Sequence, residues 1–297
     1  RDRTDADPLT YTITDKTLAL VAALSYNNLE SLVNHSLFKT IGDIVGAGVA
    51  LTNLNERQYL NDYSTPLWNA KIIAANDSNF LGATDSDKFD KGLGAVAVEI
   101  ERYGMADAVI LGFRGSEFIL DKKNDALTDL ILSVSGSSTQ SSYAYLEYMS
   151  LANDPSKEYY IAGHSLGGRL VQDTLYSVYE AKERGSSVQL PKYSATFNGL
   201  GYLALVYSSL NDSITGQYEK TLTNYYMLGD LVGQGLGASK AGTYLRTGTD
   251  EIPLFARTET GELILENTSV YSGGAVHGIV LFHYNAGLNA ETLESRN

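Results

Sequence analysis

The feature that most constrains the fold is a glycine-rich run between two apolar segments. The run is Gly163-His164-Ser165-Leu166-Gly167-Gly168. Residues 158–162 before it are typical of a buried strand, and residues 166–183 after it have the apolar spacing of a helix. A G-x-S-x-G pattern between a strand and a helix forms a sharp turn, in which the glycines leave room for the backbone and the serine is presented at the sheet edge. The pattern predicts that Ser165 is a nucleophile rather than an exposed serine in a plain turn.

The order of apolar segments predicts the fold around this turn. Strands are expected at 94–101, 107–113, 158–162, 193–197 and 224–228, and helices at 17–28, 141–151 and 166–183. The first two strands are joined by a short turn, which favours an antiparallel hairpin. The later strands alternate with helices, which favours a mostly parallel sheet covered on both faces. With the serine turn, this order predicts an α/β class and an α/β-hydrolase fold.

The remaining segments give weaker patterns. Asp15 is the expected N-cap of the first helix, residues 29–90 read as helix and loop, and 237–272 read as a loop-rich insert with short strands at 244–246 and 263–265. A last helix is expected at 277–287. The chain of 297 residues suits one large domain, 1–297, with residues 1–92 as an N-terminal helical and loop extension packing on a catalytic core at 93–290.

Composition excludes several classes of function. The net charge of −13 disfavours nucleic acid as a partner, and the absence of cysteine removes disulfides, thiolate metal sites and a cysteine nucleophile. No apolar run approaches the length that spans a bilayer, so no transmembrane segment is expected. The 21 tyrosines and the many small polar residues favour a secreted or cell-surface bacterial protein, with the cytoplasm as the alternative.

A serine nucleophile needs a histidine base, and the chain has four histidines. The order of the triad in this fold is serine, acid, histidine, so His35 comes too early, and His164 lies within the turn itself. His277 follows a glycine-rich loop that leads into a helix, whereas His283 lies in an apolar segment typical of a buried structural histidine. His277 is the preferred base, with His283 as the alternative.

The acid should follow a strand that lies between the serine and the histidine in the chain. Asp230 fits, because it comes after the apolar segment 224–228 and a glycine. Asp212 and Asp250 are alternatives, but both stand in polar segments where turn or cap aspartates are common. The backbone N–H of Leu166, at the start of a helix, is the expected oxyanion donor.

Three segments together resemble the class 3 lipases, the fungal-type triacylglycerol lipases and their bacterial relatives. Residues 109–116 are similar to a family strand that ends in F-R-G-[ST], residues 124–130 are similar to a W-x-x-D-L segment, and residues 163–168 match the family's serine turn. The resemblance covers about residues 93–285. Ala126 stands where the family usually has Trp, and no proline follows Asp230.

The resemblance implies roles for further residues. Ser116 would supply the second oxyanion donor opposite Leu166, and Asp230 and His277 stand where the family's acid and base are expected. The apolar residues Phe118, Ile119 and Leu120, followed by charged residues, would form a mobile lid over an acyl site, or else an ordinary surface loop.

The sequence therefore predicts a serine hydrolase that cleaves carboxylic esters, with lipid acyl esters as the substrate, by way of an acyl-enzyme. It needs no metal or organic cofactor, and transient contact with a lipid interface is expected. A phospholipase A1 or an esterase of polar esters is the alternative enzyme. A catalytically silent binding module of a larger surface protein is the alternative outside the enzymes.

Overall fold

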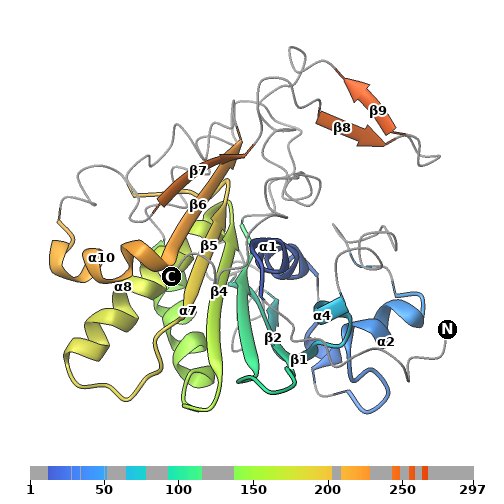
Figure 1. Cartoon of the computed structure of the whole chain (residues 1–297), viewed down its shortest axis with the longest axis horizontal. Coiled ribbons are helices and arrows are strands. Elements are labelled where there is room, and N and C mark those ends of the chain that lie inside the picture. Colours follow the sequence, from blue (N-terminus) through green and yellow to red (C-terminus); the bar gives the residue numbers. More distant parts are fainter. Residues whose placement is uncertain are drawn as a thin grey trace.

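In the computed structural model, the described residues are 13–27, 29–33, 35–49, 51, 65–77, 93–115, 137–202, 209–227, 243–247, 254–257 and 263–266. They form a central sheet with helices on its two faces and a separate pair of short strands (Figure 1).

The central sheet has seven strands that lie side by side in chain order. They are β1 (Lys71–Asp77), β2 (Gly94–Ile100), β3 (Ala108–Phe113), β4 (Glu158–His164), β5 (Tyr193–Phe197), β6 (Leu222–Met227) and β7 (Thr243–Thr247). β1, β2 and β3 pair antiparallel, whereas β3 to β7 run parallel to one another. Because parallel strands end at the same edge of a sheet, the carboxyl ends of β3, β4, β5 and β6 lie together there. A second, antiparallel sheet pairs β8 (Leu254–Arg257) with β9 (Leu263–Glu266).

Helices lie on both faces of the central sheet. The described helices are α1 (Asp15–Leu24), α2 (Ile41–Gly46), α4 (Thr65–Trp68), α7 (Ser137–Leu151), α8 (Leu166–Glu183) and α10 (Asp212–Tyr218), with 3-10 turns η2 (Glu30–Leu32) and η5 (Glu219–Thr221). Figure 1 shows α1 on one side of the strands and α7 and α8 on the other.

The alternation of side chains along the strands separates two hydrophobic cores. Val98 and Ile110 point to the face that α1 covers, and their neighbours Ala97 and Leu111 point to the face of α7 and α8. Every residue of α1 is buried, including Asp15, whose carboxylate accepts a hydrogen bond from the hydroxyl of Tyr225. A helix buried on all sides forms part of the core itself, rather than a surface addition to it.

The α/β-hydrolase fold predicted from the sequence is confirmed, with a mostly parallel central sheet, helices on both faces and a strand–serine–helix turn after β4. The antiparallel hairpin of β2 and β3 and the long helix α8 are also confirmed. α8 ends at Glu183, and Gly185 follows with a φ of 89°, which is the backbone that glycine adopts readily after a helix.

Three of the structural predictions made from the sequence were wrong. Thr14, not Asp15, is the N-cap of α1, since its hydroxyl accepts a hydrogen bond from the backbone of Thr17. The segment 29–90 contains the strand β1, which pairs with β2 and carries a bulge between Ile72 and Ala74. β7 belongs to the central sheet as its edge, although the sequence placed it in an insert. The helix expected at 277–287 lies outside the described residues.

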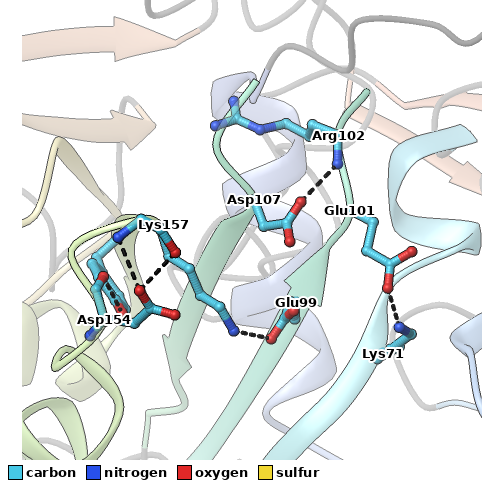
Figure 2. A network of polar contacts seen from close by, with 9 residues as sticks. Lys71, Glu99, Glu101, Arg102, Asp107, Asp154 and Lys157 are labelled. Atoms are coloured by element: carbon cyan, nitrogen blue, oxygen red, sulfur yellow. Dashed lines mark hydrogen bonds and ion pairs between the residues drawn. The ribbon is translucent and has the colours of Figure 1, made fainter. Parts of the chain in front are cut away.

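Charged side chains gather at the edge of the sheet where β3 and β4 begin (Figure 2). Lys157 pairs with Glu99 at 2.8 Å, and Lys71 pairs with Glu101. The backbone N–H of Arg102 donates to Asp107 at 3.1 Å. This edge is opposite to the one where the parallel strands end.

Glu158, the first residue of β4, accepts several hydrogen bonds at this edge. Its oxygens accept hydrogen bonds from Arg102 at 2.6 Å, from Lys192 at 2.9 Å and from the hydroxyl of Tyr160 at 2.7 Å. Partial burial alone would raise the pKa of Glu158, but the three donors favour the charged form and lower its pKa to about 2. The ion pairs therefore fix the start of β4, away from the serine at its other end.

Candidate functional site: the serine turn after β4

A single residue, Ser165, joins β4 to α8 and has an unusual backbone. Its φ is 57° and its ψ is −124°, a conformation that side chains with a Cβ rarely adopt. Among the described residues, the only other non-glycine residue with positive φ is Asn198, at the end of the neighbouring strand β5. Such a backbone costs about 1–3 kcal/mol and persists only where the surroundings hold it in place. The strain therefore lies at the residue that the sequence predicts to be the nucleophile.

The side chain of Ser165 does not serve its own helix. Serine at the residue before a helix ordinarily accepts a hydrogen bond from the first turn, as Thr14, Thr40 and Asn211 do in their helices. Within the described part of the chain, the hydroxyl of Ser165 makes no such capping bond. A serine that is strained and yet does not cap its helix lacks the usual structural reason for its place.

The glycines of the turn are required by close backbone contacts. A Cβ on Gly163 would lie 2.2 Å from the carbonyl oxygen of Gly167, and one on Gly167 would lie 2.3 Å from that of Phe113. Gly115, after β3, is as closely packed, because a Cβ there would lie 2.5 Å from the Cβ of Ser165. The chain after β3 thus passes directly beside the serine.

The segment after β5 holds the backbone of Ser165 by hydrogen bonds. The N–H of Ser165 donates to the carbonyl of Phe197 at 3.2 Å, and its carbonyl accepts from the N–H of Leu200 at 2.8 Å and from that of Gly168 at 2.9 Å. Asn198 makes the turn between them, with a φ of 45° and an N–H that donates to the carbonyl of Tyr225 at 2.8 Å. These bonds link β4, β5 and β6 around the serine and oppose relaxation of its strained backbone.

α8 in turn fixes the segment after β5 through buried polar side chains. Gln172 donates to the carbonyl of Leu200 at 3.4 Å. Arg169 pairs with Asp173 at 2.9 Å and lies 3.8 Å above the ring of Tyr202, whose hydroxyl also donates to Asp173 at 2.7 Å. Burial, with Asp173 nearby, raises the pKa of Tyr202 well above its usual value, so the phenol stays protonated as a donor.

The two described histidines, His164 and His35, each use Nδ1 in a local contact. His164 is buried, and its Nδ1 lies 2.6 Å from the hydroxyl of Tyr26, which follows α1. The Nδ1 of His35 accepts hydrogen bonds from the N–H groups of Leu37 and Phe38 at 3.2 and 3.3 Å. The preference for a later histidine as the base stays a prediction, because His277 and His283 lie outside the described residues.

The structure describes part of the predicted site. Ser165 and Leu166 are described, with Leu166 as the first residue of α8, where backbone N–H groups have no partner inside the helix. The other predicted site residues lie outside the described residues: Ser116, Phe118, Ile119, Leu120, Asp230, His277 and His283, together with the alternative acid Asp250. Asp212 lies exposed in the first turn of α10.

Two residues important to the site were missed by the sequence analysis. Tyr26 reaches the serine turn from α1, 138 positions before His164, and Leu200 contacts Ser165 from the segment after β5. No local pattern in the sequence marks either residue, since both act through contacts with distant parts of the chain.

The described residues contain neither a candidate metal site nor a membrane-spanning helix. No group of three or more His, Cys, Asp or Glu side chains in these ranges could hold a metal ion. No helix within the same ranges is long and apolar enough to cross a membrane. The site in the described residues is thus a strained serine, a helix N-terminus beside it and a closely packed strand end.

Comparison with known proteins gives matches among solved structures. No protein-family model matches the chain, and no curated protein matches it. The chain is similar in structure to a variant of the MDLA protein from Penicillium cyclopium, at 14% identity over 86% of this chain and 85% of that one, with a TM-score of 0.45. It is also similar to Lip2 lipase from Yarrowia lipolytica, at 13% identity over 95% and 96% of the two chains, with a TM-score of 0.43. A third similar structure is the Rhizomucor miehei lipase propeptide complex, at 15% identity over 93% of this chain and 82% of that one, with a TM-score of 0.43.

Proposed function

We propose that the chain is a serine hydrolase that cleaves carboxylic esters, with lipid acyl esters as its substrate class. The observation that carries the proposal is the backbone of Ser165, strained at φ 57° between β4 and α8 without capping the helix. Strain of this kind concentrates at functional positions, because folding alone gives no reason to keep it. The lipid substrate class rests on the sequence resemblance to class 3 lipases.

In the proposed reaction, His277 takes the proton of the Ser165 hydroxyl as the serine oxygen bonds to the ester carbonyl carbon. The backbone N–H groups of Leu166 and Ser116 stabilise the oxyanion, and Asp230 holds the imidazole in the required tautomer. The alcohol leaves with the proton from the imidazolium, and an acyl group remains on Ser165. Water then attacks this acyl-enzyme with His277 again as the base, and the imidazolium returns the proton to the oxygen of Ser165 as the carboxylic acid is released. His283 is the alternative base.

Hydrolysis of p-nitrophenyl butyrate by Ser165→Ala tests the proposal. We expect a loss of about 10⁴-fold or more in kcat, because the remaining groups provide only binding and oxyanion contacts. Ser150→Ala is the matched control, since Ser150 lies on the solvent-exposed surface of α7, and it should keep the wild-type rate. A Ser165→Ala protein within tenfold of the wild type would contradict the proposal.

A series of esters separates the substrate classes. We expect the rate on long-chain triacylglycerol to rise sharply once the ester exceeds its solubility and forms an interface. Hydrolysis that is confined to dissolved short-chain esters would contradict the lipid class and indicate an esterase of polar esters. Release of a fatty acid from phosphatidylcholine vesicles, without hydrolysis of triacylglycerol, would instead indicate a phospholipase.

A further inference from the structure

The hydroxyl of Tyr26 joins two segments that flank the serine. The backbone N–H of Gly115, after β3, donates to this hydroxyl at 2.9 Å, and the Nδ1 of His164, the last residue of β4, lies 2.6 Å from it. Gly115 is also the residue whose backbone passes beside Ser165. One phenol oxygen thus contacts the chain on both sides of the proposed nucleophile.

The position of Tyr26 is itself fixed by the core. α1, which it follows, is buried along its whole length and packs against β2, β3, β4 and β5. α1 also touches the sheet backbone closely, because a Cβ on Gly112 of β3 would lie 2.6 Å from the carbonyl oxygen of Val21. The N–H of Tyr26 donates to the carbonyl of Ala23 at 3.2 Å, which continues the turn of the helix.

The ring of Tyr26 adds a second contact to the serine turn. It packs edge-on against the imidazole of His164, with ring centroids 5.7 Å apart and an interplanar angle of 61°. A phenol has one proton to donate and can accept further hydrogen bonds. The oxygen of Tyr26 can therefore accept the Gly115 N–H and share a second hydrogen bond with Nδ1 of His164 at the same time.

We propose that Tyr26 is a positioning residue for ester hydrolysis, which sets the distance between the chain after β3 and the serine turn. The two expected oxyanion donors belong to these two segments, since Ser116 follows Gly115 and Leu166 follows Ser165. Oxyanion donors stabilise the transition state only when their spacing is held in advance. This inference rests on the proposed function, and it assigns a role in the reaction to the N-terminal segment of the chain.

Tyr26→Phe tests the inference, because it keeps the ring and removes only the hydroxyl. We expect kcat for p-nitrophenyl butyrate to fall about tenfold while KM changes less than twofold, since the lost effect acts on the transition state. Tyr148→Phe is the matched control. The hydroxyl of Tyr148 is also buried and donates to the carbonyl of Gln189 at 2.8 Å, on the face of α7, so kcat and KM should both stay unchanged. An unchanged kcat in folded Tyr26→Phe would overturn the inference.

Imidazole ¹⁵N spectra test the contact without any substrate. The chain has four histidines, so the His164 signals can be assigned with His164→Asn. We expect Tyr26→Phe, but not Tyr148→Phe, to shift the Nδ1 signal of His164. An unmoved signal overturns the inference alone, whereas a wild-type protein without hydrolysis overturns the proposed function.

A second variant keeps the inference testable if Tyr26→Phe does not fold. His164→Asn removes the imidazole partner of Tyr26, and we expect a several-fold fall in kcat with KM unchanged. In the double variant the two effects should be less than additive, because both substitutions act on one contact. Full additivity, or a wild-type kcat in His164→Asn, would overturn the inference.

Discussion

The backbone strain at Ser165 predicts that the residue needed for activity lowers the stability of the fold. Glycine adopts positive φ without a Cβ clash, whereas alanine keeps the clash of serine. Ser165→Gly and Ser165→Ala both remove the hydroxyl, so the difference between them isolates the strain. Both variants should be inactive, and the glycine variant should be the more stable one.

The magnitude follows from two opposing terms. The conformation at φ 57° and ψ −124° costs about 1–3 kcal/mol, which glycine removes. Glycine in turn loses more conformational freedom on folding than alanine, which costs about 0.5–1 kcal/mol. We therefore expect Ser165→Gly to exceed Ser165→Ala by about 1 kcal/mol in free energy of unfolding. For a chain of 297 residues, average unfolding entropies convert this into about 1.5 °C of Tm.

Guanidinium denaturation followed by circular dichroism measures the difference, and Ser194 supplies the matched pair. Ser194 is a buried serine inside β5 without a positive φ. At that position the order should reverse, with Ser194→Gly less stable than Ser194→Ala by about 0.5–1 kcal/mol. If Ser165→Gly is no more stable than Ser165→Ala, the serine turn stores no strain and the reasoning fails.

Two further predictions follow from the packing and the charges. Gly167→Ala should lower the free energy of unfolding by about 1–3 kcal/mol and kcat by tenfold or more. The reason is that the added methyl would lie 2.3 Å from the carbonyl oxygen of Phe113. Denaturation curves measure the first effect and ester kinetics the second. The wild type should lose stability as the pH falls from about 4.5 to about 2. In this range the unfolded chain binds a proton at Glu158, whereas the folded chain, with the pKa of Glu158 lowered from 4.5 to about 2, does not. Glu158→Gln should flatten this part of the pH profile, as measured by Tm between pH 2 and 7.

Each of these predictions has a control and a contrary result. Gly216→Ala, on α10, has no neighbour within 4 Å of the added methyl and should be neutral or up to about 1 kcal/mol more stable. Equal effects at Gly167 and Gly216 would argue against the close approach at the turn. A Glu158→Gln protein with the same acid profile as the wild type would show that other carboxylates govern its stability at low pH.

The serine turn was predictable because its determinants are local. A strand, a glycine-flanked serine and a helix are consecutive in the chain, and each produces its own pattern. The buried strands β3, β4 and β5 were equally accessible, since their apolar runs lie between clear turns. By contrast, β1 has the sequence Lys-Ile-Ile-Ala-Ala-Asn-Asp, which lacks the alternation of a half-buried strand and reads as helix or loop.

The support of the turn could not be read from the sequence, because it depends on contacts between distant segments. Tyr26 lies after a helix that looks like any buried helix, and only folding brings its hydroxyl to Gly115 and His164. The contact of Leu200 with Ser165 likewise depends on the parallel pairing of β4 and β5. The sequence-based choice of Asp230 and of His277 over His283 stays a prediction, since these residues lie outside the described ones.

The most direct test of the central claim is labelling by a fluorophosphonate probe, which reacts with activated serines. Trypsin cleaves after Lys157 and Arg169, and the peptide between them contains Ser165 as its only serine. We predict that mass spectrometry finds the label on this peptide in the wild type and not in Ser165→Ala. Absence of labelling, or labelling of a different peptide, would contradict the claim that Ser165 is the nucleophile.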